Sequence, residues 1–210
     1  MKKIFLALAS TTALSSAEFL IGGGFTHYYE DVEGFGNVNL SIAYGSISYE
    51  ILSPNSNISF IPELRIGAGI SNDSIDNFYL GNREIPTYYD YYDSISGEVT
   101  SYPYGTTSER VYTDIEFSVN SYVAILFNVK YDWGKVYGLA NVNATYMDLE
   151  ASASTQGTSI SVSEDDWTFG AGVGLGIKLT ENVATELKTE LYSVSDSIAL
   201  SSGIGFSFSF

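Results

Sequence analysis

Residue types that commonly carry out catalysis are scarce in this sequence. It has 210 residues, no cysteine and one histidine, His27. The lack of cysteine excludes disulfides, thiolate metal sites and cysteine nucleophiles, and a single histidine excludes multi-histidine metal sites. An activated serine needs a histidine base, but the sequence has no His-x-Ser arrangement. We therefore expect no catalytic residues, no metal site and no cofactor.

Charged residues spaced two apart indicate the structure of the chain better than its few potential catalytic residues do. A spacing of two places side chains on the same face of a β-strand, and here acidic and basic residues share such faces with many glycines. Interleaved opposite charges can pair when they are buried. Asp114 and Glu116 also share a face, but that spacing occurs in any polar ladder and does not indicate a catalytic pair. The predicted inward-facing charge network comprises Glu63, Arg65, Asp114, Glu116, Lys130, Lys178, Glu186, Lys188 and Glu190.

These residues lie in segments that alternate between apolar and polar residues, as strands do. The clearest segment runs over 21 residues, from Val111 to Tyr131. In another, the apolar set of Val38–Tyr44 loses phase to that of Ile47–Ile51, which predicts a bulge at Gly45-Ser46. The eight expected strands are 19–29, 38–51, 58–71, 111–131, 135–149, 167–179, 183–192 and 198–210.

The links between these strands alternate in length. Short links at 53–57, 132–134 and 180–182 alternate mostly with longer ones at 30–36, 72–110 and 150–165. The apolar faces are almost free of charge over at least the ~9–11 residues that a strand needs to cross a bilayer. The pattern predicts an all-β fold, an eight-stranded antiparallel up-and-down transmembrane β-barrel with short periplasmic turns and longer extracellular loops. A secreted β-sandwich is the alternative, but it would explain both faces poorly.

The N-terminus has the three parts of a secretory signal. Met1–Lys3 is basic, Ile4–Leu14 is apolar, and Ser15-Ser16-Ala17 supplies the small residues of a cleavage site. We expect a signal peptide at 1–17 and a barrel at 18–210; a buried N-terminal helix is the alternative. The exported chain would carry 7 basic and 25 acidic residues, and such a charge argues against binding to nucleic acid.

The C-terminus carries a motif that resembles the assembly signal of outer-membrane barrels. Gly205, Phe206, Phe208 and Phe210 provide a glycine five residues before an aromatic end, with aromatic residues alternating between them. With the signal peptide and eight strands, the whole mature chain resembles the small OmpA-like and OmpX-like outer-membrane barrels. The resemblance implies a monomer in the Gram-negative cell outer membrane, with outer-membrane lipid and the barrel assembly machinery as partners. Small barrels that deacylate lipids are similar in size, and that reaction needs a histidine base beside an activated serine. We expect His27 instead to face outward beside Phe25 and Tyr29.

The predicted extracellular side concentrates acidic residues and tyrosines. Its links and rims hold 16 acidic residues against Arg83 and Arg110, a charge of about −14. No segment has the spacing of a calcium loop, so a diffuse, cation-screened surface is favoured over an ordered cation site. Tyrosines among Ser, Gly and Asn are typical of recognition loops, but they could also extend the flanking strands as a hairpin. The tyrosines predicted to form a recognition surface are Tyr88, Tyr89, Tyr91 and Tyr92.

Two functions remain. The favoured one is non-enzymatic: surface contact or adhesion to an extracellular ligand, or a structural role in the envelope, through the acidic, tyrosine-rich loops. The other is a narrow pore or a channel for a small apolar solute, since one strand presents a row of glycines from Gly170 to Gly176. An eight-stranded barrel is normally filled by its own side chains, and Tyr112, Tyr122 and Tyr192 could fill the space beside those glycines. We therefore expect a closed barrel.

Overall fold

A computed structural model describes residues 17–32, 36–53, 56–93, 96, 98–155, 158–194 and 197–210. The predicted signal peptide lies outside the described residues, except Ala17, where the first strand begins. Within the described part of the chain, no helix is long and apolar enough to cross a membrane. The nine strands are β1 (Ala17–Val32), β2 (Gly36–Leu52), β3 (Ile58–Ser71), β4 (Asp73–Tyr92), β5 (Val99–Asp132), β6 (Val136–Thr155), β7 (Thr158–Lys178), β8 (Val183–Val194) and β9 (Ser197–Ser209).

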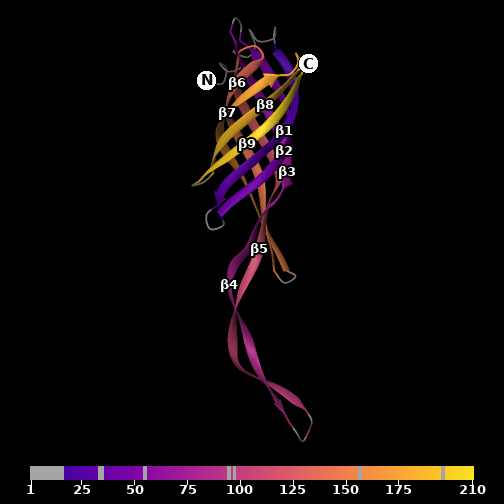
Figure 1. Ribbon diagram of the computed structural model, residues 1–210, viewed down its shortest axis with the longest axis vertical. Coiled ribbons are helices and arrows are strands. Elements are labelled where there is room, and N and C mark those ends of the chain that lie inside the picture. The colour runs from indigo at the N-terminus through magenta and orange to yellow at the C-terminus, as the bar shows by residue number, and fades with distance from the viewer. Residues whose placement is uncertain are drawn as a thin grey trace, which may run out of the picture.

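Eight of these strands form a closed antiparallel ring. Each strand in the series β3-β2-β1-β9-β8-β7-β6-β5 pairs with the next, and a further pairing of β3 with β5 closes the barrel. The short turns lie at the same end of the barrel as the C-terminus (Figure 1). The predicted eight-stranded antiparallel barrel is confirmed, and closure leaves its strands without free edges.

The ninth strand lies outside the ring and belongs to a long hairpin. β4 follows β3 after Asn72 and pairs with the first half of β5, from Asp73 with Phe117 to Tyr92 with Val99. The segment 72–110, expected as a loop or as a hairpin extending the flanking strands, is therefore a hairpin. It projects far beyond the barrel, opposite the short turns (Figure 1). At about 3.3 Å per residue, the 20 residues of β4 extend over about 65 Å.

Large apolar side chains cover the outside of the barrel. Phe169 is 69% exposed and Leu187 58% exposed, and Phe60 and Phe127 on the opposite strands are also exposed. Aromatic pairs border this surface: Tyr131 and Trp133 near the short turns, and Tyr146 and Trp167 toward the hairpin. Ten residues of a strand tilted by ~40°, the distance from Val136 to Tyr146, correspond to about 25 Å along the barrel axis. An apolar belt of this height matches the hydrocarbon core that a transmembrane barrel must cross.

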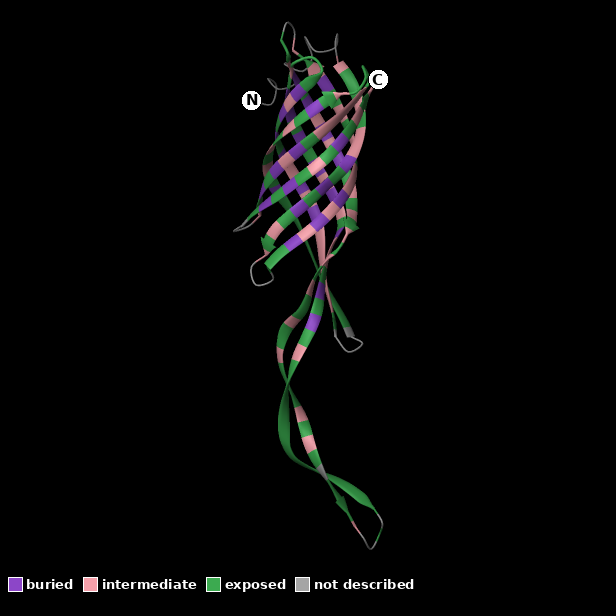
Figure 2. Ribbon diagram, viewed as in Figure 1, coloured by how far each residue is buried: buried purple, intermediate pink, exposed green. Residues whose placement is uncertain are grey.

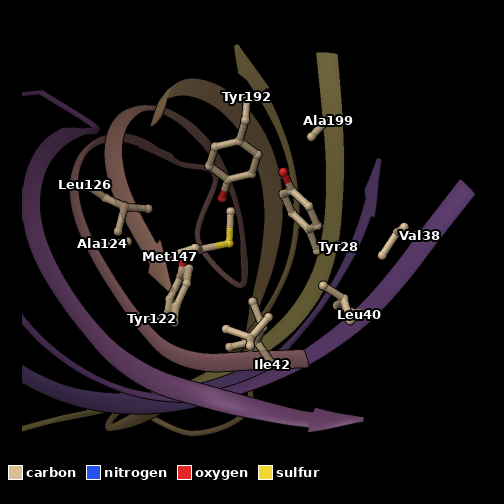
Figure 3. Close-up of a cluster of buried hydrophobic side chains, with 11 residues drawn as sticks. Tyr28, Val38, Leu40, Ile42, Tyr122, Ala124, Leu126, Met147, Tyr192 and Ala199 are labelled. Atoms are coloured by element: carbon tan, nitrogen blue, oxygen red, sulfur yellow. The ribbon is translucent and has the colours of Figure 1, made fainter. Parts of the chain in front are cut away.

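Along the strands of the barrel, buried residues alternate with exposed ones (Figure 2), and the buried side chains face the interior. Toward the hairpin the interior is mainly apolar, and Figure 3 shows the apolar side chains that gather there. This apolar plug consists of Tyr28, Val38, Leu40, Ile42, Val119, Tyr122, Ala124, Leu126, Met147, Tyr192 and Ala199. Toward the short turns the interior is mainly polar and charged, with a second, smaller apolar cluster formed by Ile61, Tyr137 and Leu139.

The plug explains why the predicted bulge at Gly45-Ser46 is wrong. β2 pairs with β1 without interruption from Gly36 to Ile51, and its register with β3 shifts elsewhere, between Ser41 and Ile42. Val38, Leu40 and Ile42 face the interior, whereas Ile47 faces outward. The apolar residues of β2 thus change face because the interior is itself apolar at the hairpin end.

A bulge does occur in β5, where the sequence predicted unbroken alternation. The register of β5 with β6 shifts between Val119 and Ser121, which reverses the faces of the strand. On the turn side of the bulge the even-numbered residues are buried, such as Leu126; on the hairpin side Ile115 is buried and Tyr112 is exposed. Tyr112 therefore does not fill the interior as expected.

Candidate functional sites: the lumen network and the projecting hairpin

A buried charge network lies in the middle of the barrel, on the turn side of the plug. The Arg65 guanidinium donates from Nε to Glu63 Oε1 at 2.9 Å and from Nη1 to Glu190 Oε1 at 3.3 Å. Lys188 Nζ lies 3.2 Å from Glu63 Oε2 and 2.8 Å from Glu186 Oε2. These five residues come from β3 and β8, on opposite sides of the ring, so the network ties the barrel together across its interior.

Neutral side chains satisfy the remaining carboxylate oxygens. The Tyr137 hydroxyl donates to Glu186 at 2.9 Å and the Tyr192 hydroxyl to Glu190 at 2.8 Å. Asn128 Nδ2 donates to Glu63 Oε2 at 3.1 Å, and Arg65 also lies 4.8 Å from the centre of the Tyr44 ring. Buried charges are tolerated when they are paired and hydrogen-bonded in this way.

Two further ion pairs lie closer to the short turns. Lys130 Nζ donates to Glu50 Oε1 at 2.7 Å and to Oε2 at 2.9 Å. Glu50 also accepts a hydrogen bond from the Ser59 hydroxyl at 2.6 Å. Lys178 pairs with Asp132 at the turn between β5 and β6. Partial burial opposes the ionisation of Asp132, but hydrogen bonds from Lys178 and from the Gly134 N–H outweigh it and hold the pKa of this carboxyl below its usual value.

The structure thus separates the nine predicted network residues into groups. It brings Glu63, Arg65, Glu186, Lys188 and Glu190 together, and it gives Lys130 and Lys178 separate partners. Glu50 was missed, although its position between Tyr49 and Ile51 in an alternating strand was a usable signal.

Asp114 and Glu116 do not belong to the network, which corrects the prediction. Both are exposed on the hairpin side of the β5 bulge. Asp114 accepts a hydrogen bond from the Asn77 N–H at 2.9 Å and Glu116 from Asn72 Nδ2 at 2.5 Å. The bulge reverses the faces of β5, so these carboxylates lie near the base of the hairpin and outside the barrel interior.

The glycines of β7 make room for the lumen side chains. A Cβ on Gly172 would lie 2.6 Å from Glu190 Cγ, and one on Gly174 would lie 2.9 Å from Lys188 Cγ. A Cβ on Gly170 would lie 2.9 Å from the Tyr192 ring, and one on Gly176 would lie 2.1 Å from Tyr137. The glycine row is therefore filled by neighbouring side chains, as expected for Tyr192. The cavity that borders Glu63, Asn128 and Lys188 is about 30 Å³, space for about one water molecule.

The projecting hairpin presents the predicted recognition tyrosines. Tyr88 is 56% exposed and Tyr92 63% exposed, and Tyr91 is similarly exposed. Tyr89 pairs through its backbone with Tyr102. Near the middle of the hairpin, Arg83 and Glu109 form an exposed ion pair at 3.3 Å. An isolated two-stranded ribbon has no core of its own, so its side chains on both faces are available for contacts.

His27 lies apart from the buried charge network. His27 faces outward, as expected, and its Nδ1 lies 3.2 Å from the Ser41 hydroxyl. Among the residues for which a structure is described, no group of three or more His, Asp or Glu side chains is placed to hold a metal ion.

The C-terminal motif lies in β9, beside the first strand of the barrel. Phe206, Phe208 and Phe210 face outward. The Phe208 and Phe210 rings pack edge to face with their centres 4.8 Å apart. The centre of the Phe210 ring also lies 6.5 Å from the centre of the Phe19 ring. Gly205 pairs with Gly24 of β1, so the last strand of the barrel lies beside the first.

Comparison with solved structures identifies the fold. The chain is similar to Ail, the attachment invasion locus protein of Yersinia pestis, with 14% identity over 93% of this chain and 99% of Ail and a TM-score of 0.51. It is also similar to Neisserial surface protein A, with 12% identity over 93% of this chain and 100% of that protein and a TM-score of 0.52. No protein-family model and no curated protein sequence matches the chain. The chain has the fold of the small eight-stranded outer-membrane β-barrels.

Proposed function

We propose that this protein is a non-enzymatic surface-contact protein of the bacterial outer membrane, in which the barrel anchors the β4–β5 hairpin and the hairpin binds an extracellular ligand. The observation that carries the proposal is the hairpin itself. A transmembrane anchor alone needs only short connections between its strands, whereas β4 continues for 20 residues and displays exposed tyrosines.

The composition of the hairpin supports a recognition role. Tyrosine offers a large contact area at low entropic cost, and Ser, Gly and Asn offer adaptable hydrogen bonds. Tyr88, Tyr89, Tyr91 and Tyr92 lie toward the tip of the hairpin, far from the apolar belt. They are therefore placed for contacts outside the membrane rather than for an interfacial girdle.

Other features support the outer membrane as the location. The apolar belt fits a bilayer, and the outward-facing Phe206, Phe208 and Phe210 are placed where the barrel assembly machinery could bind β9 during insertion. Once inserted, the closed ring leaves no strand edge within the membrane, in keeping with a monomer surrounded by lipid.

Deletion of Asn82–Thr106 tests the proposal. Gly81 pairs with Val111, so the shortened chain can close the hairpin with the four residues 107–110, a common loop length. Cells that produce the shortened protein should insert a normal barrel but lose attachment to protein-coated surfaces. The matched control replaces exposed apolar residues of the β6–β7 hairpin (Ile160→Ser with Val162→Ser) and should attach like wild type. Unchanged attachment of the shortened protein would refute the proposal.

A further inference from the structure

One face of β4 near its tip alternates between aromatic rings and a carboxylate. Tyr88, Asp90 and Tyr92 are spaced by two residues and are all exposed on the same face of the strand. The repeat of two residues along a strand is about 6.6 Å. The Ser101 hydroxyl of the paired strand donates to Asp90 Oδ1 at 2.5 Å, which orients the carboxylate within the row.

Acidic residues outnumber basic residues around this row. From Glu84 through Glu109 the sequence contains five carboxylates and no lysine, arginine or histidine. Arg83 and Arg110 border this segment, and Arg83 pairs with Glu109 near the middle of the hairpin. Glu84 lies on the same face of β4 as Asp90 and is exposed. The negative potential of such a surface attracts cations and repels polyanions.

The protein already uses this combination of groups to hold cations inside its barrel. Arg65 contacts the Tyr44 ring at 4.8 Å while it pairs with Glu63, and Lys130 contacts the Tyr137 ring at 4.9 Å while it pairs with Glu50. Tyrosine rings and carboxylates both attract guanidinium and ammonium groups, the ring through its negative face and the carboxylate through its charge.

We propose that the ligand of the hairpin is an extended protein segment with lysine or arginine at alternate positions, bound along the Tyr88–Asp90–Tyr92 row. This inference rests on the proposed function of the hairpin and specifies its partner. An extended segment presents alternate side chains on one face with the same spacing of about 6.6 Å, so its basic groups can follow the row in register. A second copy of this acidic hairpin would be repelled.

The test measures peptide binding to the mature full-length protein in lipid nanodiscs. The probe is a fluorescent ten-residue peptide of alternating Arg and Ser, and the control is a peptide of the same composition with five Arg followed by five Ser. We expect the alternating peptide to bind more tightly than the block peptide, and binding to weaken as salt is raised. Equal affinities for the two peptides would overturn the inference.

Variants then locate the site. Glu84→Gln with Asp90→Asn should weaken binding about fivefold, the effect of two exposed ion pairs, and Tyr88→Leu with Tyr92→Leu should weaken it while all charges remain. The control Glu164→Gln with Asp165→Asn removes two carboxylates from β7 and should leave the affinity unchanged. An equal loss in this control would show diffuse attraction and overturn the inference.

The outcomes separate this inference from the proposed function. If deletion of Asn82–Thr106 abolishes cell attachment but the Arg–Ser peptide does not bind, the hairpin is a contact element and its partner is not basic. If deletion leaves attachment unchanged, the proposed function itself fails.

Discussion

Arg65 is the residue on which the interior of the barrel most depends. It is buried and contacts two carboxylates on opposite sides of the ring, Glu63 and Glu190. Glu63 also pairs with Lys188, whereas Glu190 accepts its other hydrogen bonds from the neutral side chains of Asn141 and Tyr192, which do not neutralise its charge. Removing one partner of a buried ion pair is costly because the other charge stays buried without compensation.

Arg65→Met should therefore lower the free energy of unfolding by about 3–5 kcal/mol, measured by urea titration of the mature protein refolded into lipid vesicles. Arg83→Met is the matched control, because it breaks the exposed pair with Glu109 and should cost about 0–1 kcal/mol. If both variants lost the same small amount, the network would contribute no more than a surface pair.

At the scale of the strands, the alternation of side chains between the inner and outer faces of the barrel, together with the bulge in β5, decides where each side chain lies. β8 presents Leu187 to the outside and Lys188 to the interior, and this alternation continues along the strand. β5 begins as one strand of an exposed hairpin and ends in the barrel wall, and its bulge between Val119 and Ser121 joins these parts. The bulge brings Val119 into the plug and leaves Asp114 outside.

Leu187→Arg tests the outward assignment of β8. An arginine near the middle of the apolar belt should lower the free energy of unfolding in lipid by about 2–4 kcal/mol, whereas the control Leu52→Arg, at the turn end of β2, should cost about 0–1 kcal/mol. Unchanged stability of Leu187→Arg would place this face of β8 away from lipid.

At the scale of the whole molecule, a barrel with a filled interior carries a projecting, exposed hairpin (Figure 1). The apolar plug and the charge network fill successive levels of the interior, and the interior of an eight-stranded barrel is just wide enough for side chains to fill. The pore considered from the sequence would need a continuous gap past Tyr28, Leu40 and Tyr192, which the packed plug occupies (Figure 3).

Single-channel recording of the refolded mature protein in a planar bilayer should show insertion without discrete conductance steps. The variant that lacks Asn82–Thr106 should also remain closed, because the plug belongs to the ring and not to the hairpin. Reproducible steps from the wild-type protein would contradict the sealed interior and favour a pore function.

The sequence by itself determined the properties that depend on local backbone geometry. Because strand side chains alternate between faces, a period of two was enough to predict the eight strands of the ring, the apolar exterior and the inward position of residues such as Glu63 and Lys188. Tertiary structure decided which of these groups meet: Arg65 and Glu190 are 125 residues apart, and their contact depends on the register around the closed ring. It also decided the faces of Asp114 and Ile42, since a bulge and an apolar interior are set by packing between strands and leave no unique local pattern.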